Sequence, residues 1–140
     1  MNVRKTKEML GHTKLVTRLS KSTVTNVLNE NGKIQFRYDG QKHTSKVSIK
    51  PHVKWVGTWN KNGLSIDDNV RNPKDMLCMS IHEAVESYVA RRYGVDRDYT
   101  AHFIATAVEK AYARNIRHNW DDYQMRTELI YREENKWGKK

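Results

Sequence analysis

Between residues 33 and 67 apolar and polar positions alternate along the chain, which is the two-residue period of a β-strand with one buried face. Ile34, Phe36 and Tyr38 alternate with charged or polar neighbours. The pair Asp39-Gly40 then favours a tight turn. Further alternating positions follow at Val47, Ile49, Val53, Trp55, Trp59, Leu64 and Ile66. The pattern predicts a small antiparallel β-sheet of three or four strands with one polar face.

After residue 72 the apolar residues recur every three or four positions, as in amphipathic helices. Asn72-Pro73 is typical of a helix start, because asparagine caps free N–H groups and proline fits the first helical position. Gly94 is typical of a helix end. Asp96 or Asp98 can cap a second helix, and Asn119 a third. The pattern predicts three helices at about 73–93, 97–118 and 120–136.

The first 32 residues are polar and basic, and a helix near the N-terminus is weakly specified. Ser22 can cap a short helix that reaches Leu28 and ends at Gly32. The whole pattern predicts an α+β fold in a single domain, residues 1–140. We expect a basic N-terminal helical segment, a small sheet and a helical half at residues 1–32, 33–70 and 71–140.

Composition narrows the class of protein. The 140 residues include 26 Lys and Arg against 16 Asp and Glu, a net charge of +10. A single cysteine, Cys78, excludes an internal disulfide and a cysteine-rich zinc site. No apolar run approaches the 18 or so residues of a membrane span, and no apolar segment follows the basic start. We therefore expect a cytoplasmic protein without a membrane partner, whose metal ligands, if it has them, are histidines and carboxylates.

The positive charge is concentrated in the first half of the chain. Residues 1–70 hold 13 Lys and Arg against 5 Asp and Glu, whereas residues 71–140 hold 13 against 11. Clustered basic residues indicate a nucleic-acid or other anionic partner, because they release counterions when they bind phosphates. The structural alternative is a set of solvated charges on a small domain.

The first long predicted helix contains His82-Glu83-Ala84-Val85-Glu86, an HExxE motif. Residues four apart lie on the same side of a helix, so His82 and Glu86 can bind one divalent ion. Glu83 is rotated by about 100° from His82 and is available as a general base. In the related H-E-x-x-H motif two histidines hold zinc and the intervening glutamate takes a proton from the bound water. Zinc also accepts carboxylate oxygen, so Glu86 is a permitted ligand.

The second long helix carries two more candidate residues. His102 lies beside its apolar arc, and Glu109 falls within about 20° of His102 on the helix. If the two helices form an antiparallel hairpin, Glu86 meets His102 at one level and His82 meets Glu109 at another. We therefore expect His82, Glu86 and His102 to be metal ligands. We expect Glu109 to be a fourth ligand or a support that accepts the free ring N–H of a ligating histidine.

The stretch from Ser65 to about Glu109 resembles the zincin-like metallopeptidases of gluzincin type, in which a capped helix bears His-Glu-x-x-ligand and the next helix adds a ligand. It also resembles small microbial and viral proteins in which Ala-His and Ala-Thr-x-x-Glu follow His-Glu-Ala-Val-Glu. The resemblance implies a zincin-like fold, Zn²⁺, a water activated by Glu83, and hydrolysis of a peptide or protein substrate that the neighbouring strand presents.

One position departs from that family. Glu86 stands where zincins usually have their second histidine. A more anionic site makes the bound water less acidic, so metal binding is better supported than proteolysis. Histidine with carboxylates also suits manganese or iron.

Residues 19–29 are similar to the turn and recognition helix of LacI-type helix-turn-helix repressors. That resemblance implies an alternative function, a nucleic-acid-binding module or a basic viral or nucleoid structural protein. Its contacts would come from Lys21, Ser22, Thr23 and Lys33. The match is short and lacks a preceding first helix, and the two functions are not exclusive.

Each candidate residue also has an ordinary structural interpretation. His82 can be a polar residue at the edge of the core, and the glutamates can be solvated helix charges. Large aromatic residues at periodic positions usually pack. We therefore assign Trp55, Trp59 and Trp120 to the core. The remaining histidines, at positions 12, 43, 52 and 118, show no partner spacing.

Overall fold

The computed structural model describes residues 3–138, and side chains between residues 12 and 135, and it has the predicted α+β composition. Its elements follow one another as α1 (Val3–Lys21), β1 (Thr25–Glu30), β2 (Lys33–Tyr38), β3 (Gln41–Lys50), β4 (Gly57–Asn60), β5 (Gly63–Asp67), α2 (Pro73–Tyr93), a π-helical turn η1 (Arg97–Ala101), α3 (His102–Asn115) and α4 (Trp120–Gly138). None of the helices in this part of the chain has the length and apolar character needed to cross a membrane.

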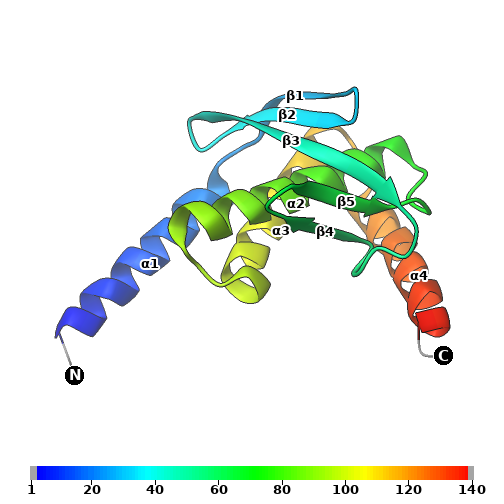
Figure 1. The fold of residues 1–140 in the computed structure, drawn as a ribbon. Helices are drawn as coiled ribbons and strands as arrows, with labels where there is room; N and C mark the ends of the chain where they lie inside the picture. Colours follow the sequence, from blue (N-terminus) through cyan, green and yellow to red (C-terminus); the bar gives the residue numbers. More distant parts are fainter. Residues whose placement is uncertain (1–2, 139–140) are drawn as a thin grey trace.

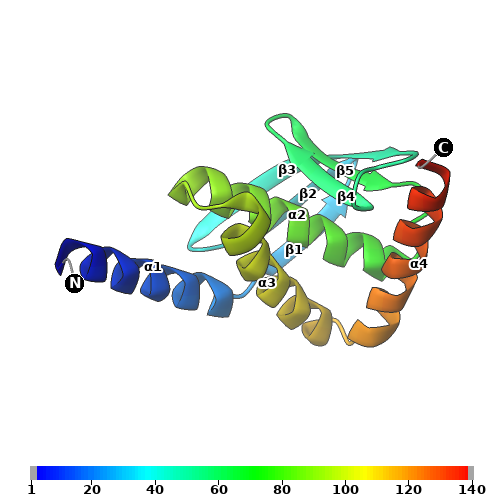
Figure 2. The same ribbon diagram turned by 90° about the horizontal axis from the view of Figure 1, so that it is seen from below.

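The strands form one sheet in the order β1-β2-β3-β5-β4. Figure 2 shows α2 lying between the sheet and α3, while α4 stands at the side of these layers. In Figure 1, α1 projects away from the rest of the molecule towards the N-terminus. Because α2 is covered on two sides, it is the central helix of the fold.

One hydrophobic core fills the space between the sheet and the helices. Ile34, Phe36 and Tyr38 of β2 are buried, as their alternation predicted. On α2 the burial extends beyond an apolar stripe, because every residue from Ile81 to Ser87 is buried. Polar side chains of α2 are therefore enclosed by the protein, which is the environment in which electrostatic contacts are strong.

The three predicted helices of the second half are present with small differences. Asn72 caps α2 by accepting hydrogen bonds from two backbone N–H groups, and Gly94 ends it with φ of 65°. The second helix begins as the π-turn η1 and ends at Asn115, earlier than predicted. Asn119 accepts a hydrogen bond from the Asp122 N–H at the start of α4. The local capping signals thus fixed the register of the helices that carry the candidate site.

The predicted helix from Ser22 to Leu28 is wrong. Ser22 instead ends α1, with both its N–H and its hydroxyl donating to the Arg18 carbonyl. The chain then forms β1, which pairs antiparallel with β2. Residues 25–30 form a strand instead of a helix because the turn at Asn31 and Gly32, with φ of 55° and 70°, folds them back onto β2, in which apolar and polar residues alternate.

This correction bears on the helix-turn-helix resemblance. Lys21 is the last residue of α1, Ser22 and Thr23 lie in the connection, and Lys33 begins β2. The described structure therefore has no helix in the place of a recognition helix. A nucleic-acid role for these four residues stays a prediction.

The prediction that all strands of the sheet are antiparallel is also wrong for one pair of strands. β5 inserts between β3 and β4 and runs parallel to β3. The connection before β4 turns through left-handed backbone conformations at His52, Trp55 and Val56. These conformations are costly for residues other than glycine, so local preference did not predict the turn. Trp55 is 62% exposed here, against the expected packing, whereas Trp59 and Trp120 pack against the core.

A buried ion cluster joins α2 to the C-terminal helix. The Asp75 carboxylate contacts Nε2 of His118 at 2.6 Å and accepts from Nε of Arg126 at 2.7 Å. Burial alone would raise the pKa of Asp75, but the hydrogen bonds from Arg126 and His118 outweigh it and hold the pKa below its ordinary value. The cluster therefore stabilises the position of α4 as long as Asp75 is ionised.

We expect Asp75→Asn to lower the free energy of unfolding by about 2 kcal/mol at pH 7, because hydrogen bonds to a charged group are lost. The folded-state pKa is depressed, so this contribution is present above the unfolded pKa of about 3.9 and is lost as pH falls through the folded value. Urea unfolding at pH 7 and pH 3 measures it. Asp68→Asn, at an exposed carboxylate, is the control. An equal deficit at both pH values would contradict the assignment.

Candidate metal centre

The antiparallel packing of α2 on α3 brings the predicted site residues together. Nε2 of His82 lies 3.0 Å from Oε2 of Glu86, and Nδ1 of His102 lies 3.1 Å from the same oxygen. Nδ1 of His82 lies 2.9 Å from Oε1 of Glu109. Both predicted pairings, Glu86 with His102 and His82 with Glu109, are confirmed, while the ligand roles stay predictions.

Three of these residues place possible metal-ligand atoms close together. One donor atom each from His82, Glu86 and His102 lie within 4.8 Å of one another. The rings of the two histidines meet edge to face, with centroids 4.9 Å apart. His82 and Glu86 are buried, whereas the His102 side chain is 57% exposed. The group is thus anchored in the protein interior on α2 and reaches solvent through His102.

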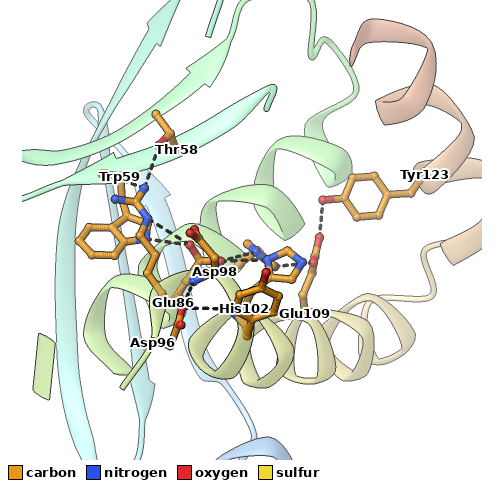
Figure 3. Close-up of polar contacts among 11 residues, drawn as sticks. Thr58, Trp59, Glu86, Asp96, Asp98, His102, Glu109 and Tyr123 are labelled. Carbon is orange, nitrogen blue, oxygen red and sulfur yellow. Dashed lines mark hydrogen bonds and ion pairs between the residues drawn. The ribbon is translucent and has the colours of Figure 1, made fainter. Parts of the chain in front are cut away.

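Glu109 lies on the other side of the His82 ring. Its Oε1 faces Nδ1 of His82, and its Oε2 accepts a hydrogen bond from the hydroxyl of Tyr123 on α4. In Figure 3, Tyr123 and Glu109 point toward one another on the far side of the site from Trp59. Because Glu109 contacts Nδ1 of His82, the other ring nitrogen, Nε2, is left to bind a metal ion together with Glu86 and His102. Glu109 then supports the ring, which was one of the two roles expected for it.

The second oxygen of Glu86 is held by residues that no sequence signal marked. Nε1 of Trp59 donates to Oε1 of Glu86 at 2.9 Å, and Nε of Arg97 lies 3.7 Å from the same oxygen. The Arg97 guanidinium also donates to the hydroxyl of Thr58 and to the carbonyl of Trp59, both at 3.0 Å. Trp59 had been assigned to the core by its alternation alone, and Arg97 and Tyr123 share no spacing with the motif.

Electrostatics within the cluster follow from burial and contact. Burial alone would lower the pKa of His82, but hydrogen bonds to Glu109 and Glu86 outweigh it and raise the pKa well above the ordinary value. Burial alone would raise the pKa of Glu86, but the contacts with His82 and Trp59 lower it. Both shifts favour a positive charge on His82 and a negative charge on Glu86 in the metal-free protein, so a metal ion would compete with a proton for His82.

Glu83 differs from the other two glutamates. It is buried beside β4, and among the described residues no hydrogen bond reaches its carboxylate. A β-carbon at position 57 would lie 3.1 Å from Cγ of Met79 and 3.3 Å from Oε1 of Glu83, so glycine leaves room for this carboxylate. Burial raises the pKa of Glu83 to about 7. A carboxylate with such a pKa is suited to take and release a proton near neutral pH.

These residues open onto a cleft of about 1060 Å³ between β4 and the helices. His82, Glu83 and Glu86 line it from α2. Aromatic residues from three other parts of the chain complete its walls, namely Trp55, Trp59, Trp120, Tyr123 and Tyr131. A concave site that combines aromatic walls with convergent polar groups is typical of a ligand or active site.

The donor set fits a small divalent cation. Glu86 lies 3.0 and 3.1 Å from a ring nitrogen of each histidine, and one donor atom from each of the three residues lies within 4.8 Å of the others. The Glu109 contact on the opposite nitrogen of His82 is the outer partner that ligating histidines usually have. His82, Glu86 and His102 are therefore close enough to bind a metal ion, and Glu109 lies where an outer partner would be.

No protein-family model, curated protein or solved structure matches this chain. The resemblance to zincins consequently depends on the sequence motif alone.

We expect Tyr123→Phe to lower the free energy of unfolding by about 1–3 kcal/mol, because the mutation leaves a buried carboxylate oxygen of Glu109 without its donor. Urea denaturation of the metal-free protein measures the change. Tyr131→Phe is the matched control, since the Tyr131 hydroxyl makes no hydrogen bond among the described residues. Equal stability of the two variants would contradict a supporting role for Tyr123.

Proposed function

We propose that the protein binds one divalent metal ion, with zinc as the first candidate, through His82, Glu86 and His102, and that it is a metal-dependent hydrolase. The observation that carries the proposal is the convergence of one donor atom from each of these residues within 4.8 Å. The two helices place the donors from positions 4 and 16 residues apart in the chain. His82 and Glu86 are buried against matched partners, which merely solvated helix charges would not be.

When bound, zinc supplies a Lewis acid that makes water acidic near neutral pH and polarises a carbonyl or phosphoryl oxygen. The chain's own contribution is proton transfer and orientation. Glu83 can accept a proton at its carboxylate and return it to a leaving group, because its pKa is about 7. Glu109 fixes the ring of His82, so that Nε2 faces the site.

A peptide is the substrate class that the surroundings favour. β4 is an edge strand of the sheet and lines the cleft beside Glu83. An extended peptide can add to such an edge through backbone hydrogen bonds. The closeness of Gly57 to Glu83 brings this edge next to the proposed base. This proposal agrees with the zincin resemblance of the motif.

We expect the purified protein to bind one zinc ion per chain. His82→Ala and His102→Ala should each weaken zinc binding more than the roughly 10–100-fold that loss of an outer partner costs. Competition with a chromophoric chelator gives the affinity, and elemental analysis gives the stoichiometry. Manganese and ferrous iron are titrated in parallel, because the donor set also suits them.

His12→Ala provides the matched control, since His12 is exposed and distant in sequence from the cluster. It should bind metal as the unmodified protein does. If the unmodified protein binds none of the three ions stoichiometrically and its melting temperature is unaffected by them, the proposal is wrong.

We expect Glu83→Gln to retain metal binding while hydrolysis of a quenched-fluorescent peptide library falls by about 100-fold or more, because the amide keeps the shape but cannot accept the proton. Fluorescence release at neutral pH measures activity, and the zinc titration measures binding. Glu30→Gln, at an exposed carboxylate of β1, is the control. Full activity of Glu83→Gln would refute its role as the base.

A further inference from the structure

The two oxygens of Glu86 have separate partners. Oε2 faces His82 and His102 at 3.0 and 3.1 Å, on the side of the proposed ion. Oε1 faces away, accepts the indole N–H of Trp59 at 2.9 Å and lies 3.7 Å from Nε of Arg97. Figure 3 shows Glu86 reached from both sides, by Trp59 and by His102. Because Oε1 is engaged by Trp59 and Arg97, Oε2 is the oxygen of Glu86 that is available to bind a cation.

The two partners of Oε1 hold each other in place. The guanidinium carbon of Arg97 lies 4.0 Å from the centroid of the Trp59 ring, within cation–π distance. Arg97 is also tied to β4 through the Thr58 hydroxyl and the Trp59 carbonyl. Because the donors are attached to a strand and to a stacked pair, they define where Oε1 can be.

We propose that Trp59 and Arg97 are positioning residues that restrict Glu86 to a single donor oxygen and draw negative charge from it. The inference rests on the proposed metal site and goes beyond it, because it concerns which metal the site selects. With Oε1 engaged, Glu86 presents one oxygen, as a histidine presents one nitrogen. The glutamate at the position of the usual second histidine is thereby adapted to a four-coordinate zinc site.

Metal chemistry explains why this restriction matters. Zinc in proteins prefers few ligands in tetrahedral geometry, whereas larger oxygen-preferring cations use carboxylates that bind through both oxygens. Five acidic residues line the cleft, and three of them, Glu83, Glu86 and Glu109, belong to the cluster described above. Partial neutralisation of Glu86 would leave a bound ion a stronger Lewis acid. Release of Oε1 should therefore change the geometry and the selectivity of the site as well as its affinity.

The experiment compares zinc and manganese affinities of the full-length protein with those of Trp59→Phe and Arg97→Gln. Trp59→Phe keeps an aromatic ring under Arg97 but removes the N–H donor. The visible absorption of the cobalt-substituted proteins reports coordination number, because four-coordinate cobalt absorbs more strongly than cobalt with more ligands. Tyr99→Phe and Arg91→Gln are controls at exposed residues that do not contact Glu86.

We expect Trp59→Phe to weaken zinc binding by about tenfold, to reduce the ratio of zinc to manganese affinity and to lower the cobalt absorption. Arg97→Gln should act in the same direction, and the controls should leave all three measurements unchanged. The Arg97 side chain is 42% exposed, so this variant carries the test if Trp59→Phe fails to fold.

Two results separate the possible failures. If the unmodified protein binds zinc but both variants keep its cobalt spectrum and its zinc-to-manganese ratio, the positioning role is wrong and the metal site stands. An equal loss of affinity for both ions with an unchanged spectrum counts as this result, because it indicates a structural effect only. If the unmodified protein binds neither zinc nor cobalt, the inference fails together with the proposed function.

Discussion

The antiparallel packing of α2 against α3 is the constraint on which the rest of the site depends. It sets the level at which Glu86 meets His102 and, one turn earlier on α2, the level at which His82 meets Glu109. A slip of one residue would move each side chain by about 1.5 Å along the helix and about 100° around it, and both contacts would be lost. Because α2 is enclosed between the sheet and α3, these contacts lie in an interior where electrostatic interactions are strong.

Elements distant in sequence complete the site around this helix pair. β4 supplies Trp59, and α4 supplies Tyr123, so that Glu86 and Glu109 each have one oxygen facing a histidine and one facing an outer donor. Glu83 has no such donor among the described residues, and burial raises its pKa to about 7. The three glutamates thus differ in their surroundings and not in residue type. Glu86 and Glu109 are fixed by hydrogen bonds, whereas Glu83 is suited to accept and release a proton.

The sequence-based predictions were accurate where the deciding interactions are between neighbours in sequence, and they failed where those interactions are between distant segments. The span of α2 was predicted correctly because Asn72, Pro73 and Gly94 act on their own neighbours. The strand at residues 25–30 was missed because its partner β2, and not its own pattern, decides its conformation. The parallel pairing of β5 with β3 depends on left-handed conformations at Trp55 and Val56, which their side chains do not favour.

The strand alternation, the helical period and the capping residues by themselves determined the α+β class and the helices of the second half. The HExxE spacing placed His82 and Glu86 together, and their meeting with His102 and Glu109 followed once the two helices were taken to form an antiparallel hairpin. These features depend on regular geometry within one helix or across one short connection, so spacing along the chain predicts them. Only the tertiary structure decided that Trp59, Arg97 and Tyr123 contact these residues. No rule of spacing relates a strand, a π-turn and a terminal helix, because their contacts arise from the packing of the whole chain.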